Sequence, residues 1–256
     1  MTLGPTAREL MVAAAAREIR DGERVFVGMR LPILAFALAQ RTHAPAALGL
    51  FENGLVRAAP ADLDGTLYTM SDPPNVAGAL WSTTTANIMG LLEQGGVDLG
   101  FIGGAEVDRY GNLNTSYVGD PRQPRVKLPG SGGGADIACL SRRVVIIMPQ
   151  ARHRFVEQVG YRTSPGHGDG PGWRERVGLP GGGPATLITT LGVFRFDEQS
   201  KEAVLASYHP GQSVDTLRAA TGWSVRVAPD VRETPVPTDA ELALVRACDP
   251  QGVWTR

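Results

Sequence analysis

The chain has 256 residues, enough for one large domain or two small ones with a substantial core in either case. Its formal net charge of −1 argues against nucleic-acid binding and against a membrane-surface role, because both favour a basic face. No apolar run is long enough to span a bilayer. The two cysteines and four histidines lack metal-ligand spacing, so we expect no metal site and a reducing, cytoplasmic location.

The first half of the chain alternates predicted helices with short apolar strands. Charged residues recur at helical spacing over 6–20, which predicts an amphipathic helix and not a secretory signal. Pro32 suits the first turn of a second helix, and Met29 and Trp81 are expected in the core. The other elements expected here are strands at 23–29, 48–53 and 97–104 and a helix at 82–96.

The second half changes pattern after a long loop at 164–184. Before that loop, "RRVVIIMPQ" at 142–150 is β-branched and uninterrupted, as in a sheet covered on both faces. After it, 185–211 alternates and turns at "DEQSKE", which predicts antiparallel strands. A helix at 213–222, a strand at 224–230 and a helix at 239–249 are then expected.

These elements predict a single α/β domain over 1–256. Strands that alternate with helices favour a mainly parallel sheet covered by helices on both faces, here with a C-terminal antiparallel hairpin. The 32 glycines and 19 prolines concentrate at 128–135 and 164–184. We interpret both stretches as loops whose backbone passes close to another group.

The stretch "FENG" at 51–54 places Glu52 where a buried strand ends. One interpretation is a solvated residue at a strand end. The other is a reactive carboxylate, because the carboxyl ends of parallel strands form the working surface of α/β sheets. Gly103, Gly104 and the loop after Gly28 are expected at the same edge, which favours the second interpretation.

Three segments together resemble a known family. They are "FENG", "GGAEVDRYGNLNTSYVGD" at 103–120 and "KLPGSGGGADIA" at 127–138, supported by "GMRLP", the loop at 164–184 and "LGVFRFDEQSKE". They are similar to the β subunit of family I coenzyme A transferases, most closely the glutaconate CoA-transferase type. The resemblance covers nearly the whole chain and implies the CoA-transferase/NagB-like fold.

The resemblance implies roles for particular residues. A β-subunit glutamate of the family attacks an acyl-CoA thioester and becomes a glutamyl-CoA thioester, which assigns that role to Glu52. Gly132 and Gly133 would offer backbone N–H groups to the acyl oxygen, although the loop could also be a plain connection. The residues expected to bind coenzyme A, as a substrate and not as a tightly bound cofactor, are Gly103, Gly104, Asn112, Gly130 and Ser131.

Several alternatives stay open at this point. Asn112 could instead close the Tyr-Gly-Asn turn, and Arg174 and Arg176 could either meet CoA phosphates or hold their loop. The expected function is a CoA-transferase β subunit acting on an acyl-CoA and a carboxylic acid, expected to be a dicarboxylate. It would need an α subunit, in a heterodimer, an α2β2 complex or a larger one. The alternatives are an acyl-CoA hydrolase, a ring-cleaving hydrolase or a decarboxylase on the same heteromeric fold, and a non-catalytic scaffold.

Overall fold

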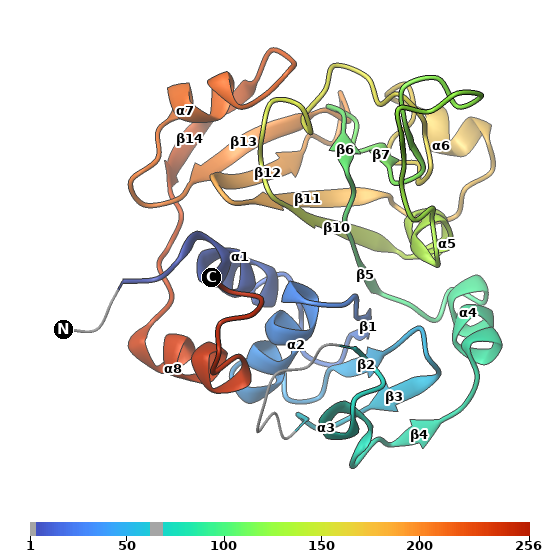
Figure 1. Ribbon diagram of the computed structural model, residues 1–256, viewed down its shortest axis with the longest axis vertical. Coiled ribbons are helices and arrows are strands. Elements are labelled where there is room, and N and C mark those ends of the chain that lie inside the picture. The colour runs from blue at the N-terminus through green and yellow to red at the C-terminus, as the bar shows by residue number, and fades with distance from the viewer. Residues whose placement is uncertain (1–3, 62–68) are drawn as a thin grey trace. The chain divides into compact units, whose positions relative to one another are not determined.

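The computed structural model describes residues 4–61 and 69–256, and it divides into two compact units (Figure 1). Unit 1 comprises Met1–Phe101 and Pro235–Arg256 within those ranges, and unit 2 comprises Ile102–Thr234. The elements of unit 1 are α1 (Ala7–Ala16), β1 (Arg24–Phe26), α2 (Leu31–Arg41), β2 (Leu48–Leu50), β3 (Leu55–Arg57), α3 (Pro73–Val76), β4 (Trp81–Ser82), α4 (Thr85–Glu93), β5 (Leu99–Ile102) and α8 (Asp239–Cys248).

The strands of unit 1 follow the order β5-β1-β2-β3-β4. The central pairs are parallel, with Phe26 of β1 opposite both Gly100 of β5 and Leu50 of β2. A tight turn then reverses the chain, so that β3 pairs antiparallel with β2, and β4 pairs antiparallel with β3. The carboxyl ends of β1 and β2 therefore lie side by side at one edge of the sheet.

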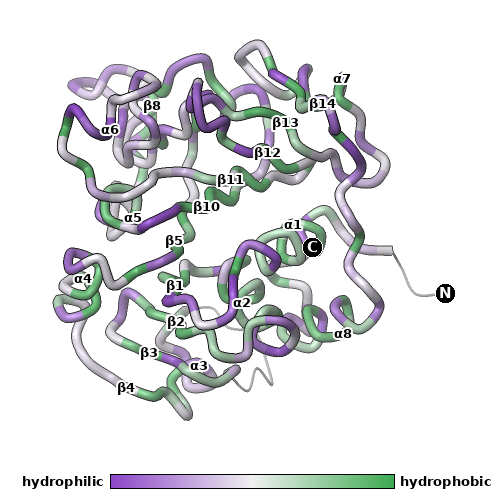
Figure 2. Tube along the Cα trace, turned by 180° about the vertical axis from the view of Figure 1, so that it is seen from behind, coloured by the Kyte–Doolittle hydropathy of each residue, from purple (hydrophilic) through white to green (hydrophobic). Residues whose placement is uncertain are grey.

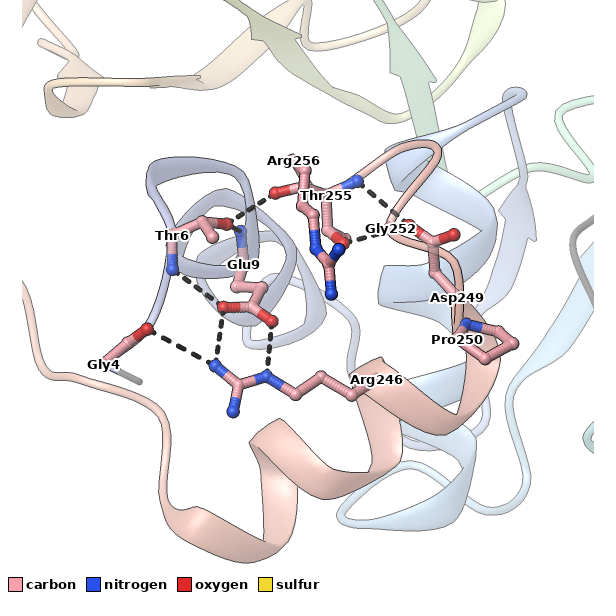
Figure 3. Close-up of a pocket in the computed structure, with 9 residues that line it drawn as sticks. All are labelled: Gly4, Thr6, Glu9, Arg246, Asp249, Pro250, Gly252, Thr255 and Arg256. Carbon is pink, nitrogen blue, oxygen red and sulfur yellow. Dashed lines mark hydrogen bonds and ion pairs between the residues drawn. The ribbon is translucent and has the colours of Figure 1, made fainter. Parts of the chain in front are cut away.

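Helix α1 packs against α2, and α8 contacts both of them. Thr6 and Glu9 form a capping box at the start of α1. Glu9 is only 3% exposed, and its carboxylate pairs with Arg246 of α8, with Nε and Oε1 2.7 Å apart. Figure 3 shows this pair in a pocket of about 230 Å³ beside the C-terminal segment. The charged residues predicted to face water on the first helix thus include one that joins two helices.

Unit 2 holds a second set of strands in the order β14-β13-β12-β11-β10. Parallel pairing joins β10 to β11 and β13 to β14, whereas β11–β12 and β12–β13 are antiparallel. Figure 2 shows β10 and β11 as hydrophobic segments, and Val144–Met148 of β10 are buried. The elements of unit 2 are β6 (Glu106–Val107), β7 (Leu113–Asn114), β8 (Tyr117–Val118), β9 (Val126–Lys127), α5 (Gly134–Leu140), β10 (Arg143–Met148), α6 (Trp173–Arg176), β11 (Pro184–Thr189), β12 (Gly192–Phe196), β13 (Ala203–Tyr208), α7 (Val214–Ala219) and β14 (Arg226–Glu233).

The loop at 164–184 is rich in glycine because its backbone packs closely. A side chain on Gly166 would overlap the carbonyl of Tyr110, and one on Gly168 would overlap the indole ring of Trp173. Gly168 also has a φ of +62°, in the left-handed region. The prediction that this backbone passes close to other groups is confirmed.

The α/β class and the antiparallel hairpin, formed by β12 and β13, are confirmed. The expectation that Trp81 belongs to the core is wrong, because this side chain is 47% exposed on the two-residue strand β4. A single functional domain stays a prediction beside the observed division into two compact units.

Candidate functional site

Glu52 lies in the tight turn that connects β2 to β3. The turn is closed by the Gly54 N–H, which donates to the carbonyl of Phe51 at 3.0 Å, and the Phe51 N–H donates to the carbonyl of Leu55 at 2.9 Å. The Phe51 side chain is 1% exposed, and its ring meets that of Phe36 edge-on at 6.4 Å between centroids. Glu52 itself is half-buried. The turn therefore starts from a fixed hydrophobic anchor.

The residues that follow Glu52 hold the turn in place. The Asn53 side-chain amide donates to the carbonyl of Met70 at 3.1 Å and to the Ser71 hydroxyl at 3.0 Å. The Gly54 carbonyl accepts a hydrogen bond from the Thr83 N–H at 2.9 Å, next to β4. Gly54 has a φ of +104°, and a side chain there would overlap the Thr83 carbonyl. Glycine is thus required after Asn53, and the turn is rigid instead of flexible.

The glycine loop at 130–134 belongs to unit 2. Gly130 has a φ of +97° and Gly132 of +48°, so both use glycine's conformational freedom. The N–H groups of Gly130 and Gly134 are occupied by the carbonyls of Thr115 and Ser131, each at 2.8 Å. Within the residues that the structure describes, the Ser131 and Gly132 N–H groups donate to no other residue. These two donors therefore remain available to a ligand.

Gly133 differs from its neighbours in the loop. It is the N-cap residue of α5, is buried, and has φ −76° and ψ −3°, which any residue can adopt. The expected role of Gly133 toward an acyl oxygen stays a prediction.

Gly103 and Gly104 follow β5 and also lie in unit 2. A side chain on Gly103 would come within 2.9 Å of the Ile147 carbonyl oxygen, and one on Gly104 within 3.0 Å of a Leu113 methyl group. Close packing therefore explains both glycines, and their contact with coenzyme A stays a prediction.

Asn112 is completely buried in a network with the loop at 164–184. Its side-chain amide donates to the Asp108 carboxylate at 2.9 Å and to the Gly168 carbonyl at 2.8 Å. Its amide oxygen accepts from the Gly166 and Gly168 N–H groups. Burial raises the pKa of Asp108, against hydrogen bonds from Asn112 that lower it. These contacts support the turn-closing alternative, and contact between Asn112 and coenzyme A stays untested.

Arg174 also has an internal role. Its side chain is 5% exposed and donates to the carbonyls of Gly166, Gly181, Ala138 and Cys139. Burial lowers the pKa of its guanidinium. The hydrogen bonds favour the alternative in which Arg174 holds the loop, because they use the donors that a phosphate would need.

The structure brings Arg30 into view, which the sequence-based search for site residues missed. Arg30 precedes α2 and follows β1, and its φ of 68° with ψ of −120° is a conformation that suits glycine. The only hint in the sequence is an arginine between Met29 and Leu31-Pro32, where no capping side chain stands before the helix.

Glu52 and Arg30 lie in unit 1, whereas the predicted site residues at 103–133 lie in unit 2. Among residues 4–61 and 69–256, we find no group of three or more His, Cys, Asp or Glu side chains that could hold a metal ion. Over the same ranges, no helix is long and apolar enough to cross a membrane.

Comparisons with known proteins give consistent matches. The sequence profile described as Coenzyme A transferase matches residues 8–220. The β subunit of 3-oxoadipate CoA-transferase from Pseudomonas knackmussii is 38% identical over 249 residues, covering 95% of this chain and 93% of that protein. The structure of glutaconate coenzyme A-transferase from Acidaminococcus fermentans superposes with a TM-score of 0.90 at 32% identity, covering 98% and 97% of the two chains. The decarboxylase AibA/AibB superposes with a TM-score of 0.82 at 31% identity, covering 97% and 96%.

Proposed function

Because the chain belongs to the coenzyme A transferase family, we propose that it is the subunit whose Glu52 receives coenzyme A from an acyl-CoA and passes it to a free carboxylic acid. The expectations of a family I CoA-transferase β subunit and of a CoA-transferase enzyme are confirmed by similarity over nearly the whole chain. The assignment of individual residues to steps of the reaction is our proposal.

The observation that carries the proposal is the clamped turn around Glu52. A carboxylate is a weak nucleophile in water, and it becomes effective when the protein holds it in line with the reacting carbonyl. Buried Phe51 fixes one side of Glu52, and the Asn53 and Gly54 hydrogen bonds fix the other. Such a turn at the carboxyl edge of parallel strands suits covalent catalysis better than a solvated strand end.

The proposed reaction conserves the thioester in each half. The Glu52 carboxylate attacks the acyl-CoA carbonyl, which breaks the carbon–sulfur bond and gives a mixed anhydride and the CoA thiolate. The thiolate then attacks the Glu52 carbonyl, which forms the glutamyl-CoA thioester and releases the first acid as a carboxylate. The acceptor carboxylate reverses these steps and leaves as its CoA thioester, so that Glu52 is regenerated. Ping-pong kinetics follow, because the first acid leaves before the second one reacts.

Each attack places negative charge on a carbonyl oxygen. We propose that the Ser131–Gly133 segment stabilises this charge, because the Ser131 and Gly132 N–H groups have no acceptor within the described part of the chain. Fixed backbone donors need no rearrangement as the charge develops, and loss of one such donor typically costs about 2.7–4 kcal/mol of transition-state stabilisation. Gly132→Val should therefore lower turnover in addition to any effect on stability.

We infer that the acid is a dicarboxylate. The CoA-transferases of Pseudomonas knackmussii and Acidaminococcus fermentans are named for 3-oxoadipate and glutaconate, and both acids carry two carboxyl groups. A second carboxylate would give the protein a charged group to recognise away from the reacting centre.

A partner chain completes the proposed enzyme. The similar proteins are named as one of two subunits or as a pair of components, so an α subunit is expected to join this chain. Leu80 and Trp81 are 65% and 47% exposed, and their strand continues into Thr83, which bonds Gly54 of the Glu52 turn. We propose that the α subunit covers this apolar edge and shields the turn from water. The two cysteines support a cytoplasmic location for the complex.

A decarboxylase is the second candidate, because AibA/AibB has a similar fold at 31% identity. The two functions differ in their need for a free acid: transfer consumes an acceptor carboxylate, whereas decarboxylation releases carbon dioxide from the acyl-CoA without one. Activity should therefore be measured with and without an acceptor acid.

The test uses the chain purified together with its α subunit. We expect CoA transfer from succinyl-CoA to glutarate with ping-pong kinetics, and no transfer by this chain alone. Glu52→Gln should abolish transfer, because an amide does not attack as a carboxylate does. Glu52→Asp should be severely impaired, since a displacement of about 1 Å can cost roughly 10²-fold. Glu93→Gln, an exposed carboxylate at the end of α4, is the matched control and should keep full activity. Ordinary transfer by Glu52→Gln, or acyl-CoA turnover that needs no acceptor, would refute the proposal.

A further inference from the structure

Arg30 occupies a backbone conformation that costs energy. Its φ of 68° and ψ of −120° lie where side chains clash with the backbone and where glycine is the usual residue. Among the described residues other than glycine, Arg30 and Lys201 have positive φ values. Such strain persists where the surroundings impose it, and it concentrates at functional sites. An arginine is therefore being kept at a position that glycine would occupy without strain.

The position of Arg30 relates it to the Glu52 turn within unit 1. Strands β1 and β2 are parallel neighbours, with Phe26 opposite Leu50 and the Val27 N–H bonded to the Leu50 carbonyl at 2.9 Å. Adjacent strands lie about 4.8 Å apart. The residues just beyond Phe26 therefore leave the sheet beside the residues just beyond Leu50. Arg30 and Glu52 emerge from the same edge of this sheet.

The Arg30 side chain is held in a way that leaves its donors usable. The residue is exposed, and its guanidinium carbon lies 5.3 Å from the centre of the Trp254 ring. Among residues 4–61 and 69–256, no hydrogen bond or ion pair is made by this guanidinium. A guanidinium that stacks on an aromatic face keeps its N–H groups free in its own plane, where they match a carboxylate.

The Trp254 ring belongs to an anchored segment. The carboxylate of Asp249 accepts hydrogen bonds from the N–H groups of Val253, Trp254 and Thr255, at 2.9 to 3.0 Å. Figure 3 shows Asp249 and Thr255 on this C-terminal segment next to α1. The ring is therefore a fixed platform, and Arg30 has limited freedom to turn away from the sheet edge.

We propose that Arg30 binds the remote carboxylate of the dicarboxylic acid while the other carboxyl group reacts at Glu52. The proposal rests on the transferase function given above and names a residue that selects its acid. Arginine also binds phosphate, which coenzyme A would supply. We favour the carboxylate because the pantetheine arm holds the CoA phosphates far from the thioester, whereas the two carboxyl groups of a short diacid are only a few bonds apart.

The test compares glutarate with pentanoate, acids of equal chain length that differ by one carboxylate. In the complex with the α subunit, Arg30→Gly should lower the ratio of kcat/KM for glutarate to that for pentanoate by about 10- to 100-fold, the loss typical of a charge-assisted hydrogen-bonded pair. The effect should fall mainly on the KM for glutarate, with the KM for acyl-CoA little changed. Arg30→Lys should recover part of the ratio, because it keeps the charge but loses the planar fork.

Lys201→Gly is the matched control. Lys201 has a φ of 60° between β12 and β13 in unit 2, so glycine there removes similar strain without touching the proposed acid site. Both glycine variants should raise the melting temperature, by about 2–4 °C or more. Only Arg30→Gly should change the preference for glutarate.

A binding measurement separates failure of this inference from failure of the transferase proposal. Glutarate should raise the melting temperature of the wild-type complex more than pentanoate does, and Arg30→Gly should remove that difference even if no CoA transfer occurs. The inference is wrong if Arg30→Gly keeps the glutarate preference in both assays. It is also wrong if the variant raises the KM for acyl-CoA instead, which would assign Arg30 to a CoA phosphate.

Discussion

Replacing Gly54 by alanine should damage the Glu52 turn in a way that the structure makes quantitative. Gly54 has a φ of +104°, and an alanine Cβ would overlap the Thr83 carbonyl, lying 2.7 Å from its carbon atom. The φ strain alone costs about 1–3 kcal/mol. Forcing an atom against a fixed backbone adds roughly 1–3 kcal/mol. We therefore expect Gly54→Ala to lower the free energy of unfolding by about 2–5 kcal/mol.

Gly95→Ala provides the reference for this prediction. Gly95 has a φ of +72°, but a Cβ there has nothing within 4 Å. Only the conformational strain applies, so the expected loss in the free energy of unfolding is about 1–2 kcal/mol. The difference between the two variants then measures the overlap with Thr83.

The assay is urea denaturation of this chain, followed by transfer measurements with the α subunit. The urea midpoint of Gly54→Ala should fall by about 1–2 M, and that of Gly95→Ala by less than half as much. Transfer by Gly54→Ala, measured where it remains folded, should drop about 10²-fold because Glu52 is displaced. Equal midpoints for the two variants, or full activity in Gly54→Ala, would refute the account of a clamped turn.

Two further predictions concern buried groups of unit 2. Burial lowers the pKa of His167 from 6.5 to about 4, so between these values the unfolded chain binds more protons and the free energy of unfolding falls with pH, by at most about 3 kcal/mol. His167→Gln, whose amide can still donate to the Pro184 carbonyl, should show a shallower loss between pH 6.5 and 4 in urea titrations, and an unchanged slope would contradict the assignment. Asn112→Ala should lower the free energy of unfolding by about 2–4 kcal/mol, because it leaves the Asp108 carboxylate and two backbone N–H groups without their partner. A change below 1 kcal/mol in chemical denaturation would exclude a structural role for Asn112.

Local sequence patterns predicted the elements of the fold well. The β-branched run at 142–150 became β10 at Arg143–Met148, and the "DEQSKE" turn joins β12 to β13. The helix expected over 6–20 ends at Ala16, because the next residues form turns that lead to Gly22 with a φ of +76°. Such boundaries depend on local backbone geometry that periodicity does not encode.

Burial was harder to predict than element type. Trp81 has the composition of a core residue, but it lies on an edge strand of two residues where little of the described chain covers it. Glu9 has the composition of a surface residue, but α8, more than 200 residues later in the chain, supplies Arg246 as its partner. Contacts between distant segments decide both outcomes, and no local pattern contains them.

The candidate site was predictable only in part. "FENG" correctly indicated a carboxylate at a strand end, because Asn-Gly after an apolar run is typical of a tight turn. The strain at Arg30 was not predictable, since nothing about an arginine indicates a positive φ. The close packing of Gly103 and Gly104 was equally hidden, because it depends on Ile147 and Leu113 from other strands.

The most direct test of the central claim is to trap the intermediate on Glu52. The complex with the α subunit is incubated with acyl-CoA in the absence of an acceptor acid and then treated with borohydride, which reduces a thioester but spares a free carboxylate. We predict a peptide in which Glu52 carries a hydroxymethyl group in place of its carboxyl group, and no such change when acyl-CoA is omitted. Modification of another residue, or an unmodified Glu52 in an enzyme that transfers coenzyme A at its normal rate, would contradict the claim that Glu52 is the nucleophile.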